Sequence, residues 1–289
     1  MFDKLISLIS EYAHDGFSNA AEKLNEFILS VDDFTDILMQ IGTIPESIAH
    51  DSTEEKLFAK VSDAVLARAF RELGLKSTIL YERADSADVF AESNIYGYTL
   101  VADAKAFRLS RTAKNQKDFK VGALSSWRKE EDYAVLCSPY FQYPRSQSQI
   151  YAQAVDNNVC LLSWEHLIFL LRHGIKESET INLSALWNFG ENISHTTFVA
   201  DKKKCFMREF DSQCITTADL SQRDFDNVLL SCIESIRSRG DMEKAYWESE
   251  RELILSYSRE EAIAELIKSK KIDEKIRHID LYIRRISRD

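Results

Sequence analysis

The sequence predicts an α/β fold in which a mixed β-sheet is flanked by helices at both ends of the chain. Short β-prone segments alternate with helical segments in the middle of the chain, whereas helical periodicity dominates its two ends. The composition is that of an ordinary globular protein, with 45% apolar and 29% charged residues and only 3 Pro and 8 Gly. Because 289 residues can bury a substantial core, we expect a single domain over residues 1–289.

The first predicted elements are helices. Residues 1–42 carry apolar side chains at helical spacing and end at Gly42, a plausible helix stop. A longer helix is expected over residues 52–73, where Ser52 and Glu55 have the spacing of a capping box and Gly74 follows the last turn. These segments predict a helical N-terminal region over residues 1–50, followed by the first helix of the core.

The middle of the chain predicts the sheet. Five β-prone segments are expected to form strands: 78–81, 88–91, 98–102, 133–136 and 159–162. Helices are expected between the later strands, at residues 114–129 and 147–157. We therefore expect an α/β core over residues 51–175.

Helical patterns dominate after the predicted sheet. They begin with an amphipathic segment over residues 164–172, which carries His166 and ends just before His173. Residues 219–288 are almost wholly helical in pattern and richly charged, and Gly240 is their one expected break. The mainly helical region over 176–289 is expected to pack onto the core or to form a subunit interface.

Two acids and a lysine lie at the ends of predicted strands. The 15-residue step from Asp88 to Asp103 allows a hairpin turn through Gly97, which would bring the two carboxylates side by side. Asp103 is expected to be an exposed carboxylate, and Lys105, two residues later, projects from the same face. Paired carboxylates hold hard divalent cations through oxygen, and a neighbouring ammonium can orient water. This trio is typical of a metal-dependent phosphodiesterase.

A basic segment follows the trio. Between residues 105 and 120 the only acid is Asp118, against six positive residues, so the segment carries about +5 in a chain of net charge −10. A concentrated basic segment in an acidic protein indicates a nucleic-acid contact. The residues predicted to bind DNA are Arg108, Arg111, Lys114, Asn115, Gln116, Lys117, Asp118 and Lys120. For Asp118, an alternative is that it balances neighbouring lysines.

Residues 101–105 and 107–121 closely resemble the corresponding segments of the HindIII-type restriction endonucleases, members of the PD-(D/E)XK nuclease superfamily. The resemblance continues, in the same order, at residues 52–58, 132–136, 141–144, 163–167, 186–189 and 258–263. It covers most of the chain and is thinner in the first few dozen residues and around 195–240. The resemblance implies a PD-(D/E)XK nuclease core for the predicted sheet.

The resemblance also implies an activity. It is that of a Type II restriction endonuclease that uses Mg²⁺ and acts as a homodimer on double-stranded DNA at the palindrome AAGCTT, leaving 5′ overhangs. A cognate DNA methyltransferase is implied as a functional counterpart, not as a bound partner. Two alternatives remain: a repair or structure-selective nuclease with the same core, and a DNA-binding protein that no longer cleaves.

The site residues implied by the resemblance are Asp88, Asp103 and Lys105 as catalytic residues, with the Ala104 carbonyl joining the two acids as a metal ligand. Asp88 follows Ala87, where the superfamily often has proline. Glu55 is a further catalytic candidate, because similar nucleases place a glutamate from an upstream helix near the metal, although helix capping explains it equally well.

Several other features restrict the function. Glu82 ranks below Glu55, and His166 and His173 are expected to be packing or surface residues. No Gly-rich phosphate loop is visible, so we do not expect the protein to use ATP. The five widely spaced cysteines predict reduced thiols in the cytoplasm, and neither a signal peptide nor an apolar run of ~20 residues indicates a membrane.

Overall fold

The computed structural model describes residues 1–80, 86–111, 116–144, 148–194 and 202–286. The chain divides into two compact units, residues 1–240 and residues 241–289. The first unit contains the sheet and most of the helices, and the second consists of helical chain alone. That residues 1–289 form one nuclease domain stays a prediction.

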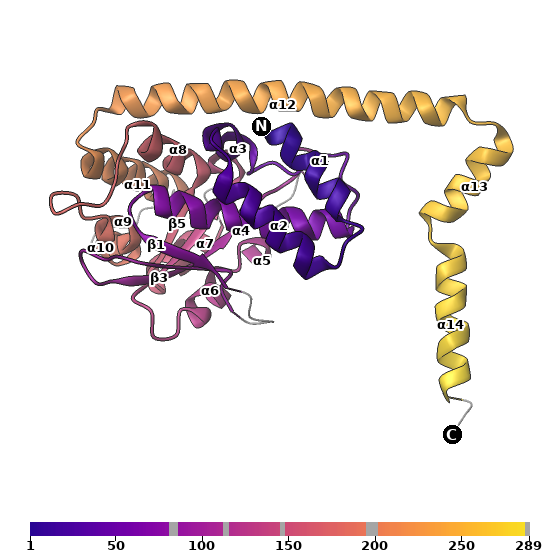
Figure 1. Cartoon of the computed structure of the whole chain (residues 1–289), viewed down its shortest axis with the longest axis horizontal. Coiled ribbons are helices and arrows are strands. Elements are labelled where there is room, and N and C mark those ends of the chain that lie inside the picture. Colours follow the sequence, from indigo (N-terminus) through magenta and orange to yellow (C-terminus); the bar gives the residue numbers. More distant parts are fainter. Residues whose placement is uncertain (81–85, 112–115, 145–147, 195–201, 287–289) are drawn as a thin grey trace. The chain divides into compact units, whose positions relative to one another are not determined.

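The sheet is mixed, as predicted, and its five strands follow chain order from edge to edge. Strands β1, β2 and β3 are antiparallel, whereas β3, β4 and β5 are parallel. Figure 1 shows the sheet lying among the helices of the first unit. The bounds of the strands are Lys76–Ile79, Val89–Glu92, Thr99–Ala104, Tyr133–Ser138 and Val159–Ser163. All five predicted strands are therefore confirmed with small shifts at their ends, and residue 81 lies outside the described residues.

Helices cover both faces of the sheet. Consecutive residues are buried along β3, β4 and β5, which requires cover on both sides because neighbouring side chains point to opposite faces. Helix α4 (Thr53–Glu72) packs against β1, β2 and β3, while α6 (Val121–Trp127) and α7 (Ile150–Asp156) pack against the later strands. The start of β2 and the end of β3 thereby lie next to the buried face of α4.

The predicted N-terminal helices are confirmed as α1 (Phe2–Tyr12), α2 (Phe17–Ser30) and α3 (Phe34–Gln40). The predicted capping box of α4 is only half formed. The Ser52 side chain accepts from the Glu55 amide at 3.1 Å, but the Glu55 carboxylate accepts from the Asp51 amide at 2.8 Å instead of from that of Ser52. The Glu55 side chain is thereby held at the extreme N-terminus of the helix.

The predicted helix over 114–129 is wrong as a single element. Helix α5 (Gln116–Phe119) and helix α6 are separated by Lys120, which has a φ of +48°. A residue in the left-handed region cannot continue a right-handed helix, so the chain turns at this lysine. The predicted helix over 147–157 is confirmed as α7, with residues 145–147 outside the described part.

The second half of the chain is helical, as predicted. A short 3₁₀ turn, η1 (Tyr140–Gln142), precedes α7. The first unit ends with the start of α12 (Gln222–Ser256), and before it come α8 (Trp164–Arg172), α9 (Ser184–Trp187), α10 (Phe189–Ser194) and α11 (Lys202–Ala218). The expected break at Gly240 is wrong, because α12 continues through it. One glycine costs about 1 kcal/mol in a helix interior, which a 35-residue helix can absorb.

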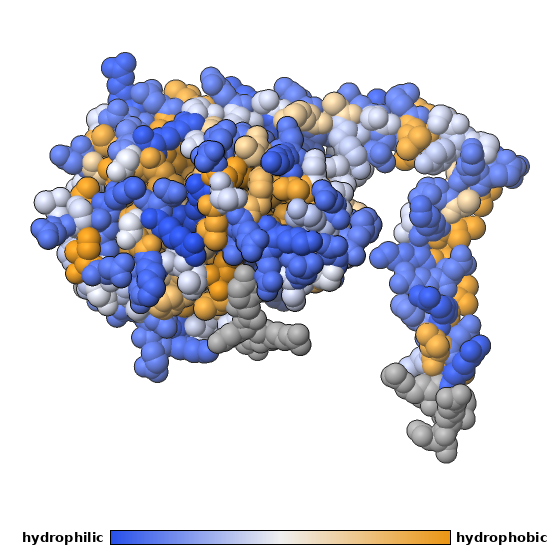
Figure 2. All heavy atoms as spheres, in the orientation of Figure 1, coloured by the Kyte–Doolittle hydropathy of each residue, from blue (hydrophilic) through white to orange (hydrophobic). Residues whose placement is uncertain are grey.

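The second unit contains the end of α12, then α13 (Arg259–Ser269) and α14 (Ile272–Ile286). Ser258 caps α13 in a reciprocal capping box with Glu261. Apolar side chains run along these helices in Figure 2. None of the described helices is long and apolar enough to cross a bilayer.

Candidate active site

Three carboxylates converge where β2 begins and β3 ends. Asp88 directly precedes β2, and its amide donates to the Ala102 carbonyl at 3.2 Å, which places it beside Asp103 as the predicted hairpin requires. Asp103 is only 3% exposed, so its predicted exposure is wrong: α4 and the neighbouring strand cover the end of β3. Ala104 ends β3 opposite Cys137 and is partly exposed.

The third carboxylate, Asp63, comes from the buried face of α4 and was not predicted. One oxygen from each of Asp63, Asp88 and Asp103 lies within 4.8 Å of the other two. The sequence does carry a signal for it, because Asp63 lies between the buried Val61 and Ala64 on the apolar face of an amphipathic helix. A buried charged residue needs a partner, and the strand ends supply it.

Two lysines contact this cluster, one directly after β3 and one from α4. Lys105 follows β3 and places its Nζ 2.5 Å from Oδ2 of Asp103, on the same face as predicted. Its backbone amide donates a hydrogen bond to the Cys137 carbonyl at 2.8 Å, and the Trp164 indole donates to the Lys105 carbonyl at 3.0 Å. Lys60, from α4, forms an ion pair with Asp88 and lies 3.5 Å from Asp63.

Burial disturbs the ionisation of the cluster. It raises the pKa of Asp63 well above its ordinary value, the charges of Asp88 and Asp103 raise it further, and the ammonium groups of Lys60 and Lys105 oppose this change. Burial likewise raises the pKa of Asp103, against the lowering effect of Lys105. Burial therefore makes Asp63 and Asp103 hold their protons more strongly than exposed carboxylates do.

The carboxylates fit a divalent cation. Carboxylate oxygens are the preferred ligands of hard cations, and three within 4.8 Å of one another can share one ion. The Oδ2 atom of Asp103 is buried and receives no hydrogen bond of acceptable geometry, although the Lys105 ammonium is close enough for an ion pair. The ion pair still attracts the two groups, because attraction between charges depends on distance more than on angle. The oxygen still has lone pairs for a metal.

Glu55 lies elsewhere on α4. It is eight residues from Asp63, about 12 Å along the helix axis. Its carboxylate accepts a hydrogen bond from Arg108 at 2.7 Å and contacts His50 at 3.0 Å. Burial would raise the pKa of Glu55, but hydrogen bonds from the Asp51 amide, Arg108 and His50 outweigh this effect and lower the pKa. His50, Asp51 and Glu55 form a second group of metal-ligating types among the described residues, but two of the three are exposed. Asp63, not Glu55, is the α4 acid that meets Asp88 and Asp103.

The predicted DNA-binding segment is partly engaged with the protein itself. Arg108 donates to Glu55 and to the Pro45 carbonyl, and Arg111 pairs with Asp118 at 2.7 Å. Asp118 thus balances an arginine instead of its lysine neighbours. Lys117 and Lys120 are exposed and Gln116 is partly exposed. Of the other predicted residues, Lys114, Asn115 and the lower-ranked Glu82 lie outside the described residues.

His166 belongs to a buried network that holds α8. Its Nδ1 lies 2.8 Å from the Ser163 hydroxyl and its Nε2 lies 2.8 Å from Asp211, which also accepts from Tyr140. These residue types resemble a hydrolytic triad, but Ser163 and His166 are wholly buried and the Ser163 hydroxyl caps α8. The network is structural, and the packing role predicted for His166 is confirmed.

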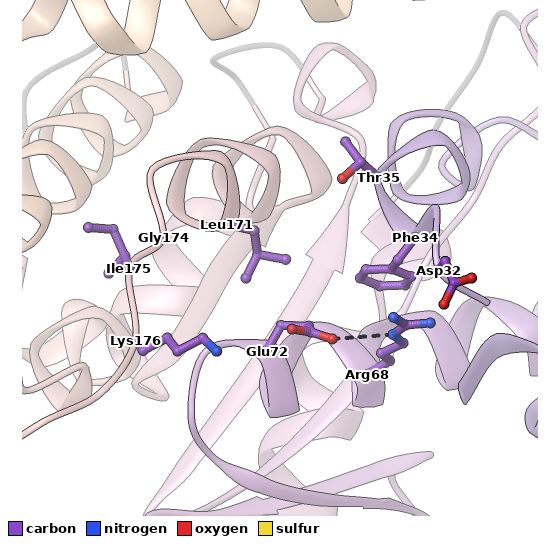
Figure 3. Close-up of a pocket in the computed structure, with 9 residues that line it drawn as sticks. All are labelled: Asp32, Phe34, Thr35, Arg68, Glu72, Leu171, Gly174, Ile175 and Lys176. Atoms are coloured by element: carbon purple, nitrogen blue, oxygen red, sulfur yellow. Dashed lines mark hydrogen bonds and ion pairs between the residues drawn. The ribbon is translucent and has the colours of Figure 1, made fainter. Parts of the chain in front are cut away.

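A pocket of about 200 Å³ lies between α3, α4 and the segment after α8 (Figure 3). Its main cation, Arg68, donates to the Ile28 and Val31 carbonyls at 2.5 and 2.6 Å, and its guanidinium lies 4.5 Å from the centre of the Phe34 ring. These contacts use the guanidinium to close the end of α2. None of the three clustered carboxylates lines this pocket, so it is separate from the cluster.

Comparison with known proteins identifies the family. The model of the HindIII restriction endonuclease family matches residues 2–282. The chain belongs to the HindIII restriction endonuclease family. It is 44% identical over 286 residues to the Type II restriction enzyme HindIII of Haemophilus influenzae, with 98% of this chain and 95% of that enzyme covered. The predicted family is therefore confirmed.

Among solved structures, the fold is similar to the small subunit of the heterodimeric restriction endonuclease R.BspD6I. That match has 11% identity and a TM-score of 0.40, and it covers 63% of this chain and 99% of that subunit. Restriction endonuclease FokI matches with 12% identity and a TM-score of 0.36, covering 57% of this chain and 32% of FokI.

Membership of the HindIII family establishes the activity class. The chain is a Type II site-specific deoxyribonuclease that acts on double-stranded DNA with a divalent metal cofactor. This activity class excludes the predicted alternative of a DNA-binding protein that no longer cleaves. The carboxylate cluster is the candidate place for the metal.

Proposed function

We propose that Asp63, Asp88 and Asp103 hold Mg²⁺, with the Ala104 carbonyl as a further ligand, and that Lys105 is the catalytic lysine. The observation that carries this proposal is the convergence of the three carboxylate oxygens within 4.8 Å, with the Lys105 ammonium against Asp103. A bound Mg²⁺ would act as a Lewis acid that offsets negative charge on the scissile phosphate. Glu55 is then a helix-capping residue that orients Arg108.

The chain's own residues supply the positioning. Asp103 forms an ion pair with Lys105 and thereby holds the lysine ammonium beside the cluster. A lysine ammonium has three donors, so Lys105 can hold a water molecule and a phosphate oxygen together while the water attacks. The bonds from Lys105 to Cys137 and from Trp164 to Lys105 restrain the backbone of the catalytic lysine. This restraint reduces the motion lost on reaching the transition state.

We propose AAGCTT as the recognition sequence, with a staggered cut that leaves 5′ overhangs, because the relative that is 44% identical is named HindIII. Digestion of a plasmid of known sequence in Mg²⁺, followed by mapping of both ends, tests this. Fragments that end only at AAGCTT sites support the proposal. Cleavage at junctions, lesions or unrelated sequences instead indicates the repair or structure-selective alternative. Five free cysteines fit action in the reducing cytoplasm.

Base reading is proposed for the segment after the catalytic lysine. Gln116 begins α5, only eleven residues beyond Lys105, and an amide side chain can bond to adenine in a bidentate manner. Lys117 and Lys120 are exposed and suit phosphate contacts. Arg108 and Arg111 are further proposed DNA contacts, as are Lys114 and Asn115, which lie outside the described residues. Asp118 contributes through its ion pair with Arg111.

Replacing Gln116 with alanine is expected to cost about 1–3 kcal/mol of affinity for an AAGCTT duplex and little for random DNA. Lys117→Ala is the matched control, because loss of a phosphate contact weakens both duplexes alike. Fluorescence anisotropy at one fixed salt concentration measures both. Equal losses on both duplexes for Gln116→Ala would remove Gln116 from the base-reading set.

We propose that the enzyme is a homodimer. A palindrome presents the same edges twice, so a two-fold protein matches it with one active site per strand. Helices α13 and α14 offer a surface for self-association. Ile272, Ile276 and Ile279 follow coiled-coil spacing along α14 and are 38–59% exposed. The first turn of α14 is acidic and Arg277 and Arg284 follow, so antiparallel pairing of two copies would bring opposite charges together.

A double substitution, Ile276→Asp and Ile279→Asp, is expected to convert the dimer to a monomer, because it places charge in the apolar stripe. Light scattering after size-exclusion chromatography should then give 33.3 kDa in place of twice that mass. His278→Asp, between the two isoleucines in sequence but off the stripe, is the control and should remain dimeric. A double variant that remains dimeric would move the interface elsewhere.

Replacing Asp63 with asparagine is expected to abolish cleavage yet raise the melting temperature in EDTA by about 2–4 °C at neutral pH. The raised pKa of Asp63 means that ionisation costs the folded state stability, and asparagine removes this cost. The gain should vanish below about pH 4, where aspartate is protonated in both states. Calorimetry between pH 4 and 8 measures this, and an unchanged or lower melting temperature at pH 7 would contradict it.

A further inference from the structure

Lys60 occupies an unusual place in the candidate active site. It lies on α4, one helical turn before Asp63, and its side chain is one-third exposed. Its ammonium pairs with Oδ1 of Asp88 and lies 3.5 Å from Oδ2 of Asp63. One ammonium thus serves two of the three carboxylates that we assign to the metal, while Lys105 serves the third.

We propose that Lys60 is an internal counter-ion that occupies the cation site when no metal is bound and competes with the divalent ion for Asp63 and Asp88. The inference rests on the proposed metal site and adds a residue that sets its affinity. Lys60 holds the carboxylates together in the free enzyme, and the metal competes with its ammonium for Asp63 and Asp88.

The charges of the site support competition. Three carboxylates face two ammonium groups in the metal-free protein, so Lys60 removes part of a repulsion that would otherwise separate α4 from the strand ends. A divalent ion held by the same carboxylates reverses the balance, because it and the Lys60 ammonium then repel each other at a few ångströms. Binding of either cation to Asp63 and Asp88 therefore weakens binding of the other.

The side chain of Lys60 is also able to leave. Its stem has four rotatable carbon–carbon bonds, and a third of it is already exposed, so a change of rotamer carries the ammonium toward solvent. Lys105 has the same stem but is more buried, with its side chain 18% exposed, and its backbone is restrained on two sides. The structure therefore separates a displaceable lysine from a fixed one.

The test is a titration of Mn²⁺ without DNA, followed by calorimetry, on the full-length protein and two neutral variants, Lys60→Met and Lys60→Gln. Both variants are expected to bind Mn²⁺ about five- to tenfold more tightly, because a competing partly buried charge is gone. In EDTA both should melt a few degrees lower than the parent. Lys60→Arg retains the charge and should bind Mn²⁺ within about threefold of the parent.

Lys76→Met is the matched control. Lys76 pairs with Glu92 at the end of the β1–β2 pair away from Asp88 and is 68% exposed, so its loss should change neither Mn²⁺ affinity nor melting temperature. Unchanged or weaker Mn²⁺ binding by the folded Lys60→Met and Lys60→Gln variants would overturn the inference. Failure of both to fold even in Mn²⁺ would also overturn it, since Lys60 would then be an ordinary structural residue.

Asp103→Asn separates this inference from the proposed function. If the parent binds Mn²⁺ and Asp103→Asn does not, the metal site stands, and the Lys60 variants alone decide the role of the counter-ion. If Asp103→Asn binds Mn²⁺ as well as the parent does, or if no variant binds it, the proposed metal site falls and the Lys60 inference falls with it.

Discussion

Replacing Asp103 with asparagine is expected to lower the single-turnover rate of DNA cleavage by at least about 10³-fold while specific DNA binding survives. Asp103 links the proposed metal ligands to the proposed catalytic lysine, since it lies beside Asp88 and pairs with Lys105. Asparagine keeps the size of the side chain but removes both the charge for the metal and the ion pair with the lysine. The fold should remain intact, because burial already disfavours the charged form.

Rapid-quench assays on an AAGCTT duplex in Mg²⁺ measure the rate, and anisotropy in EDTA measures the affinity. Glu179→Gln, an exposed acid in a loop after α8, is the control and should cleave at the parental rate. Cleavage by Asp103→Asn within tenfold of the parent would contradict the assignment. Asp88→Asn should behave like Asp103→Asn, because both are proposed ligands of the same cation.

Replacing Lys105 with methionine is expected to slow the chemical step by about 10²–10⁴-fold and to change DNA affinity by less than about threefold. Methionine preserves most of the apolar stem and removes the ammonium proposed to hold the attacking water. Because that interaction is made mainly in the transition state, its loss appears in the rate and not in ground-state binding.

The comparison that decides the role of Lys105 is with Lys117→Met, an exposed lysine proposed to contact phosphate. That variant should lose affinity and flatten the salt dependence, with a nearly normal single-turnover rate at saturating enzyme. If Lys105→Met instead loses only affinity, Lys105 is another phosphate contact, and the catalytic lysine must be sought elsewhere in the cluster.

Local chemistry was sufficient for much of the fold. The bounds of α8, the start of α4 after Ser52 and the five strands follow from capping residues and apolar periodicity, which act within a few residues of the chain. The pairing of Asp88 with Asp103 was also predictable, because a hairpin between two short strands leaves few registers. The family followed from ordered sequence resemblance along most of the chain.

Where local signals conflicted with longer-range packing, prediction from sequence failed. Lys120 adopts a left-handed conformation inside an otherwise helical pattern, and α12 passes through Gly240 without a break. Neither outcome is encoded in the residue alone. A lysine has no preference for positive φ, and a glycine lowers helix stability by only about 1 kcal/mol, so the surrounding chain decides both.

The sequence by itself determined the alternation of elements, the two strand-end acids and the lysine that follows them, because these depend on neighbours close in the chain. Only the tertiary structure decided that Asp63, and not Glu55, joins Asp88 and Asp103, and that Lys60 pairs with two of these acids. Glu55, Lys60 and Asp63 all lie on α4, and helical periodicity does not say which turn of that helix meets the strand ends. That choice is made by the packing of α4 on β2 and β3, where burial of charge requires a partner.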